Sequence, residues 1–315
     1  MNDPLDDPAV VFLRRDLLAL GYDDRAIRDR VRAGIWQRIR HGAYVEKPLW
    51  DASDAVGRHR LLARAVLRTA HPSAALTHVS AVIEHGAATW GVDLSEVHVS
   101  RPDGVGGRRQ ARVAHHGGGL LESEIETVHG VRVSGAARSA VELSTMADVE
   151  SSLVTANWML AHEQTSVEEV LEYVDRFQFW PGTLRKHVLR QLLDARNAWP
   201  GEARTSYLLW REHLPQAQPQ CEVRDAVGNL IGVVDFAWPE FGVFLEFDGR
   251  IKYDRLRRPG ETLSDVILRE KRREEQICAA TGWVCIRIGW EDLDRPVTTA
   301  RRIRALLASR RPNAS

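Results

Sequence analysis

Four acidic residues stand in one otherwise apolar stretch of the chain, Gly232 to Gly249, and three of them lie outside its central corner. Two runs rich in Val and Phe flank a Trp-Pro-Glu-Phe-Gly corner, which predicts a tight β-hairpin that carries Asp235, Glu246 and Asp248. Because the second run alternates, Glu246 and Asp248 are expected on one face of its strand and apolar side chains on the other. A half-buried carboxylate without a partner is costly. A divalent metal ion is the partner that we expect here.

A metal ion held by these acids would give the site a definite chemistry. Hydrolysis of a phosphodiester needs an activated water and stabilisation of charge on the phosphate, and Mg²⁺ or Mn²⁺ can supply both. Asp235 and Glu246 on adjacent strands can converge on one ion, and Glu202 on the preceding helix can approach it from the side. We therefore expect Glu202, Asp235 and Glu246 as metal ligands. Asp248 extends this acidic, catalytic patch.

The last third of the chain must supply the elements that position these acids. Trp199-Pro200-Gly201 marks a break before it. Apolar periodicity and turn signals then predict helix 202–214, strands 218–224, 230–236 and 243–248, helix 264–281, strand 283–288 and helix 297–308. This αβββαβα order is typical of one mixed sheet with helices on its faces.

Several short motifs of this segment, roughly residues 200–310, match one family pattern. They are Glu202, Val234-Asp235-Phe236 with Trp238-Pro239, Leu245-Glu246-Phe247-Asp248-Gly249, Lys252-Tyr253, Glu270-Lys271-Arg272-Arg273-Glu274, and 282–287 leading to Trp290-Glu-Asp-Leu293. On these motifs the segment resembles the very-short-patch-repair-like (Vsr-like) branch of the PD-(D/E)XK endonuclease superfamily. The resemblance implies a restriction-endonuclease-like fold and metal-dependent cleavage of DNA.

One position departs from the pattern of that superfamily. The pattern places a lysine two residues after the strand glutamate, and here Asp248 stands there. Lys252, or Lys271 on the following helix, could substitute, because a flexible ammonium group needs only to be spatially near. Lys252 is therefore included among the catalytic candidates. A nuclease fold that has lost its activity and serves as a binding platform is the alternative.

The first 50 residues predict a small winged helix-turn-helix. A helical pattern stops at Gly21, a second helix spans 25–33, and the alternating run 35–40 turns at His41-Gly42 and returns as 43–45. In such a unit the second helix enters the major groove and the wing reaches the backbone or minor groove. The candidates for nucleic-acid contacts are Arg28 and Arg32 on the helix, Arg38 and Arg40 on the wing, and Lys271 and Arg272 in the last segment.

Two motifs of the winged segment, Val31-Arg-Ala-Gly34 and Arg40-His-Gly-Ala-Tyr44, match a second family. On these motifs residues 8–48 resemble the winged-helix domain of AbiEi-type antitoxins. The resemblance implies binding to DNA. A winged unit that binds a neighbouring protein is the alternative.

Residues 51–198 predict a mixed α/β middle region, so that the domains expected are 1–50, 51–198 and 199–315 and the class is α/β (α+β). Helices are predicted at 54–70, 76–88, 135–147, 150–162, 166–177 and 184–196, around strands 96–100 and 112–115 that a hairpin connection at 103–107 joins. His71, His78 and His85 recur every seven residues. On a helix seven residues span about 10.5 Å, too far for one ion.

Charge is segregated along a chain whose formal net charge is zero. Residues 25–47 carry seven Arg and Lys against two acids, residues 250–273 nine against four, and residues 121–175 eleven acids against two arginines. Binding to phosphates depends on local charge, so the basic ends suit DNA, although solvated faces explain such runs as well. The three cysteines form no C-x-x-C pair, which favours buried thiols.

The start of the chain shows no signal-peptide pattern, and no uncharged run is long enough to span a bilayer. We therefore expect a cytoplasmic protein that has no membrane partner and no small-molecule cofactor. The main hypothesis is a metal-dependent DNA endonuclease that its winged helix targets. The alternatives are a catalytically inactive DNA-binding regulator of antitoxin type and a protein-interaction module that uses the acidic middle region. Nicking of plasmid DNA with Mg²⁺ or Mn²⁺, and its loss in Asp235→Ala, separates the first hypothesis from the others.

Overall fold

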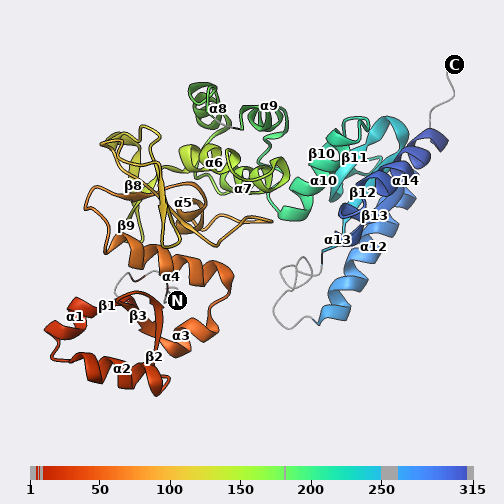
Figure 1. Ribbon diagram of the computed structural model, residues 1–315. Coiled ribbons are helices and arrows are strands. Elements are labelled where there is room, and N and C mark those ends of the chain that lie inside the picture. Colours follow the sequence, from red (N-terminus) through yellow and green to blue (C-terminus); the bar gives the residue numbers. More distant parts are fainter. Residues whose placement is uncertain (1–4, 6, 8–9, 181, 250–261, 311–315) are drawn as a thin grey trace. The chain divides into compact units, whose positions relative to one another are not determined.

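The structure is a computed structural model that describes residues 5, 7, 10–180, 182–249 and 262–310. The chain divides into two compact units, Met1–Gln191 and Leu192–Ser315, which are described separately (Figure 1). Both units mix helices with sheets, as the sequence predicted. Lys252 lies outside the described residues. None of the helices in the described part of the chain is both long and apolar enough to cross a membrane.

The start of the first unit has the order and pairing of a winged helix. Its elements are β1 (Phe12–Leu13), α1 (Arg14–Ala19), α2 (Asp24–Arg32), β2 (Trp36–Arg40) and β3 (Ala43–Glu46). The three strands form an antiparallel sheet in the order β1-β3-β2. The first helix is shorter than its apolar pattern suggested, because Phe12 and Leu13 pair with Tyr44 and Ala43 of β3 instead of joining the helix.

The remainder of the first unit is built on a second sheet. Its elements are α3 (Lys47–Ala52), α4 (Ala55–Leu67), β4 (Ala75–Leu76), α5 (His78–Glu84), β5 (Val97–Ser100), β6 (Arg108–Gln110), β7 (Val113–His116), the 3₁₀ turn η3 (Glu122–Glu124), β8 (Ile125–Val128), β9 (Val131–Ser134), α6 (Ala136–Ser144), α7 (Val149–Ala161), α8 (Val167–Arg176) and α9 (Thr183–Leu192). The sheet order is β6-β7-β5-β4-β9-β8.

The predicted hairpin connection at 103–107 is wrong. Strands β5 and β7 are parallel neighbours, so no hairpin can join them. The chain instead enters the edge strand β6, which pairs antiparallel with β7 after a turn at Ala111 and Arg112, both with positive φ. The short strand β6 is fully exposed and lacks the apolar alternation that marks a strand in a sequence.

Helix α4 contributes to two cores of the first unit. Leu61 and Ala65 pack with Val11, Leu13 and other residues of the three-stranded sheet. Ala63 and Val66, on another side of the same helix, pack against the larger sheet through a cluster that includes Leu76, Val97, Val99, Val113 and Val133. One helix therefore covers both sheets, which fixes where the winged segment lies within this unit.

The second unit confirms the predicted αβββαβα order. Its elements are α10 (Pro200–Arg211), β10 (Gln218–Arg224), β11 (Leu230–Trp238), the 3₁₀ turn η4 (Pro239–Phe241), β12 (Val243–Phe247), α12 (Leu263–Thr281), β13 (Val284–Ile288), a short α13 (Trp290–Leu293) that was not predicted, and α14 (Pro296–Ser309). The sheet order is β10-β11-β12-β13, with β12 and β13 parallel and the other neighbours antiparallel.

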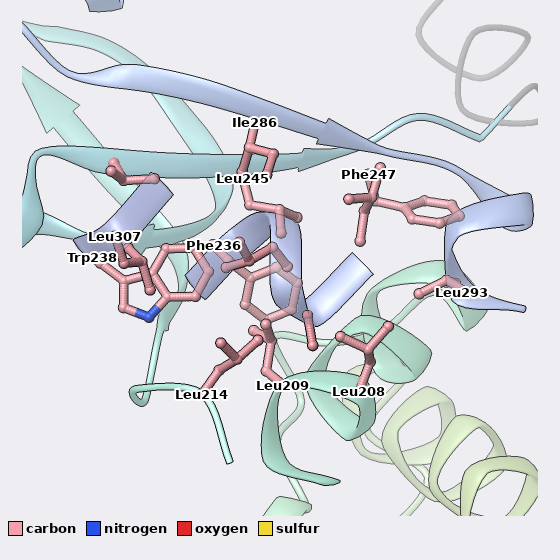
Figure 2. Close-up of a cluster of buried hydrophobic side chains, with 14 residues drawn as sticks. Leu208, Leu209, Leu214, Phe236, Trp238, Leu245, Phe247, Ile286, Leu293 and Leu307 are labelled. Carbon is pink, nitrogen blue, oxygen red and sulfur yellow. The ribbon is translucent and has the colours of Figure 1, made fainter. Parts of the chain in front are cut away.

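The alternation predicted for β12 is present and divides the core of this unit. Figure 2 shows Leu245 and Phe247 packed with side chains of α10, such as Leu208 and Leu209, in one buried cluster. Phe244, which precedes Leu245 in sequence, belongs to a different cluster together with Ile277 of α12. Strand β12 is buried on both faces, and Glu246 shares its face with Phe244.

The three cysteines are free and half-buried, so the expectation that they are buried is only partly right. Burial raises the pKa of the Cys285 thiol to about 12.

Candidate DNA-binding surface and carboxylate cluster

Helix α2 exposes a basic face because its apolar positions are few and lie together. Asp23 caps the helix, its Oδ1 accepting a hydrogen bond of 2.7 Å from the Ala26 N–H. Ile27 is 3% exposed and forms the buried side. Arg25, Arg28 and Arg32 are exposed on the remainder of the helix surface, as predicted. Asp29 lies 3.9 Å from Arg25 and 3.8 Å from Arg32, ion pairs too long and too exposed to hold either arginine.

An aromatic cluster positions α2 against the wing. The Tyr22 and Trp36 rings meet edge to face at a centroid separation of 5.3 Å. The guanidinium of Arg30 lies 5.0 Å from the Tyr22 ring centroid and 5.1 Å from that of Trp36. Such cation–π contacts hold the side chain over the rings. Arg30 therefore serves the packing of the helix and is not part of its free basic face.

The two predicted arginines of the wing lie on β2 in different environments. Arg38 is exposed, and its guanidinium lies 3.0 Å from His41 Nδ1 at the turn of the wing. Arg40 is half-buried, and burial lowers its pKa from the ordinary value. The ladder to β3 shifts register between these two residues. Such a bulge re-aims the side chains next to it.

Asp235 and Glu246 lie side by side on neighbouring strands, as the sequence predicted. The antiparallel register pairs Phe236 with Leu245. Asp235 precedes Phe236 on β11 and Glu246 follows Leu245 on β12, so the two acids lie next to this pair on the same side. Asp235 is 5% exposed and Glu246 4%. Asp235 Oδ2 accepts a hydrogen bond of 2.8 Å from the Phe247 N–H, which ties its carboxylate to the backbone of β12.

Glu246 has a protein cation beside it. The Arg273 guanidinium of α12 donates to Glu246 Oε1 at 2.9 Å and lies 2.9 Å from Glu270 Oε2. The same guanidinium donates to the Val233 carbonyl of β11. A buried carboxylate requires a positive partner, and an arginine of the described chain supplies one here.

Glu202 lies at the start of α10, beside the same strands. Its Oε2 accepts a 3.2 Å hydrogen bond from the Trp199 N–H, so it also caps the helix. Its Oε1 accepts one of 3.3 Å from the side chain of Gln220, which follows the Pro219–Phe236 pair on β10. Glu202 is 7% exposed. A Cβ on Gly201 would lie 2.1 Å from the Phe247 ring, so glycine permits this close approach of α10 to β12.

The remaining predicted site residues of the second unit are more peripheral. Asp248 is exposed and lies 3.9 Å from Arg287. Arg287 pairs with Glu274 through its Nε at 2.9 Å. Lys271 and Arg272 are exposed on α12. The structure thus buries Glu202 on α10, Asp235 on β11 and Glu246 on β12, and leaves Asp248 at the surface.

Metal-ligand spacing occurs elsewhere in the chain. Within the described ranges, one group of at least three His, Cys, Asp or Glu side chains has ligand atoms all within 4.8 Å of one another, and it consists of His78, His98 and His116. The carboxylates of Glu202, Asp235 and Glu246 do not form such a group in this structure. His71 and His85, which share the seven-residue spacing with His78, are not in the histidine group either. No local motif links the three histidines, so sequence reasoning missed them.

Comparison with known proteins assigns one segment of the chain. Residues 9–47 match the family model of the AbiEi antitoxin transcriptional regulator. The match covers β1 to β3 and the start of α3, and so coincides with the winged helix. No curated protein matches the chain. The winged segment is therefore similar to the DNA-binding part of an antitoxin-type transcriptional regulator.

Proposed function

We propose that this protein is a DNA-binding regulator of antitoxin type, acting in the cytoplasm. The observation that carries the proposal is the exposed arginine face of α2 within the segment, residues 9–47, that matches the AbiEi antitoxin regulator. Helix α2 would enter the major groove with Arg28 and Arg32 toward the DNA. Arg38 and Arg40 of the wing would contact the adjacent backbone or minor groove.

Binding of labelled duplex DNA from the region upstream of the chain's own reading frame tests this proposal. The full-length protein should shift the duplex, and the affinity should fall steeply as salt is raised. Arg28→Ala with Arg32→Ala should weaken binding at least tenfold. Arg132→Ala is the matched control, because Arg132 pairs with Glu122 at 2.7 Å on the other sheet of the same unit. The proposal is contradicted if the wild type does not bind the duplex, or if the wild type, the double variant and Arg132→Ala bind it equally.

A metal-dependent endonuclease of the Vsr-like PD-(D/E)XK type is the second candidate. It is supported by three buried acids, each less than 8% exposed, on α10, β11 and β12 of one unit. In that proposal Asp235, Glu246 and Glu202 hold Mg²⁺ or Mn²⁺, and Asp248 extends the acidic patch. Lys252, which lies outside the described residues, is the candidate for the missing lysine. The metal would activate water and stabilise the charge that develops on the phosphate. Arg273, which donates to Glu246, must then either move away when the metal binds or supply the positive charge of the usual lysine, whose position Asp248 occupies.

Nicking of supercoiled plasmid separates the two candidates. The endonuclease proposal requires nicking by the full-length protein with Mg²⁺ or Mn²⁺, and its loss in Asp235→Asn. Glu240→Gln is the control, since Glu240 lies in η4 at the opposite end of the hairpin. If the protein binds DNA but does not cut it with any divalent ion, the endonuclease proposal fails and the regulator proposal stands. Equal nicking by wild type and Asp235→Asn points to a contaminating nuclease and contradicts the second candidate.

A further inference from the structure

Three histidines from distant parts of the first unit form one cluster. His78 begins α5, His98 lies on β5 and His116 ends β7. The parallel register pairs His98 with Ala114 and Ser100 with His116, so the two strand histidines are diagonal neighbours on one face of the sheet. His78 and His98 are 3% and 2% exposed, and His116 is half-buried. The ligand nitrogens of the three rings all lie within 4.8 Å of one another.

The backbone at His78 is held in an uncommon conformation. Its φ is +53°, in the left-handed region that non-glycine residues rarely adopt. The surrounding structure therefore places this ring against the other two at some conformational cost. The His78 N–H donates to Glu142 Oε2 at 3.1 Å, which contributes to that placement.

Burial favours the uncharged form of all three rings. It lowers the pKa of His98 to about 3 and that of His116 to about 4, and it lowers the pKa of His78 as well. A neutral imidazole offers the lone pair that a metal ion needs. At neutral pH the cluster is thus a set of three uncharged nitrogen donors.

The nearest acid is already engaged by other groups. Glu142 Oε2 lies 3.8 Å from His78 Nδ1. It accepts hydrogen bonds from the His78 N–H at 3.1 Å and from Ser134 Oγ at 3.1 Å, while Oε1 accepts one of 2.7 Å from Arg138. This carboxylate therefore supports the cluster from outside, and the donors that face one another are imidazoles.

We propose that His78, His98 and His116 form a binding site for one divalent transition-metal ion of the zinc class. Imidazole donors suit Zn²⁺, Ni²⁺ and Cu²⁺, whereas Mg²⁺ and Ca²⁺ take oxygen ligands. A proton on His78 Nδ1 directed at Thr77 Oγ1, 3.1 Å away, leaves Nε2 for the ion, an arrangement common among metal-bound histidines. Water completes the coordination from the half-buried His116 side.

The structure also shows what must change when the ion binds. His98 Nδ1 and His116 Nε2 are 2.8 Å apart and share a hydrogen bond, and the His78 and His116 rings are stacked at 3.8 Å. Two nitrogens on one tetrahedral Zn²⁺ stand about 3.3 Å apart, given Zn–N bonds of about 2.0–2.1 Å. The ion therefore replaces this hydrogen bond, opens the pair slightly and unstacks the rings.

Titration of chelator-treated full-length protein with Zn²⁺, followed by calorimetry, tests the site. We expect one Zn²⁺ ion at this site per chain, and at least a tenfold loss of Zn²⁺ affinity in both His98→Gln and His116→Gln. Neither substitution should change any heat observed with Mg²⁺. Co²⁺ in place of Zn²⁺ should give the intense visible absorption of a tetrahedral site. His115→Gln, the neighbour of His116 on the same strand, and Asp235→Asn, in the carboxylate cluster, should bind Zn²⁺ as wild type does.

Each contrary result is distinguishable. No Zn²⁺ binding by wild type, or only the weak absorption of octahedral Co²⁺, overturns the proposal. Unchanged Zn²⁺ affinity in His98→Gln and His116→Gln assigns the metal to other histidines, and loss in Asp235→Asn assigns it to the carboxylates. Thermal unfolding without metal verifies that each variant is folded. If His98→Gln is not folded, His116→Ala replaces it in the test, because His116 is half-buried. The Zn²⁺ affinity of His116→Ala must then fall at least tenfold.

Discussion

Arg273 of α12 and Glu246 of β12 form an ion pair of 2.9 Å, in which the glutamate side chain is 5% exposed and the arginine side chain 25%. The pair joins the long basic helix to the hairpin that carries the acids. A buried charge that keeps its partner is tolerated, whereas one that loses it strongly destabilises a fold. The relationship therefore bears on stability as well as on any chemistry of the carboxylates.

Replacement of Arg273 should destabilise the second unit. Arg273→Met leaves the Glu246 carboxylate without this cation, and we expect a loss of about 3–5 kcal/mol in the free energy of unfolding. Urea denaturation followed by circular dichroism measures it. Arg272→Met, on an exposed position of the same helix, should change stability by less than about 0.5 kcal/mol. Equal effects of the two substitutions would show that the pair is not required.

Gly201 should tolerate no side chain. A Cβ at this position would lie 2.1 Å from the Phe247 ring, so Gly201→Ala must displace α10 or the ring, at a cost of about 1–3 kcal/mol. Chemical denaturation measures the loss. Gly289→Ala is the matched control in the same unit, because the nearest atom to its added Cβ is 3.5 Å away. A Gly201→Ala variant as stable as wild type would contradict the close packing of α10 on β12.

Two arginines of the winged segment should separate stability from DNA binding. Arg30→Ala removes the cation–π contacts to Tyr22 and Trp36 and should cost about 1 kcal/mol of stability. Arg28→Ala should leave stability unchanged and lower the slope of log affinity against log salt by roughly one. Thermal unfolding and DNA titrations at several salt concentrations measure both. The assignment of roles fails if the two variants exchange these phenotypes.

Stability should fall as the pH falls below the ordinary histidine pKa. His59 of α4 is buried, with its ring nitrogens 3.0 Å from the Leu94 carbonyl and 2.9 Å from Ser80 Oγ, and burial lowers its pKa below 6.5. Below pH 6.5 the unfolded chain takes up a proton that the folded chain resists. The contribution of His59 is thus complete above this pH and decreases below it.

His59→Gln should therefore lose less stability than wild type between neutral pH and mildly acidic pH, measured as the free energy of unfolding in urea. His71→Gln replaces an exposed histidine and should keep the wild-type dependence. A pH dependence that is the same in wild type and His59→Gln would assign the acid sensitivity to other groups.

The amino-acid sequence by itself determined the local architecture. The alternation of Val243 to Phe247 predicted its two faces, because a strand has a fixed period of two. The predicted helices 25–33 and 264–281 agree with α2 and α12 to within one residue, because capping signals such as those of Asp23 and Gly282 act over a few residues. The same local patterns predicted the winged helix that the antitoxin family model matches.

Only the tertiary structure decided which distant side chains meet. Arg273 reaches Glu246 across 27 positions, and His98 meets His116 because β5 and β7 are parallel neighbours. A periodic pattern tells which face of an element is buried, but it carries no information about which polar group of another element will lie opposite. That choice depends on strand order and helix packing, which arise from the collective burial of many apolar residues across the whole unit.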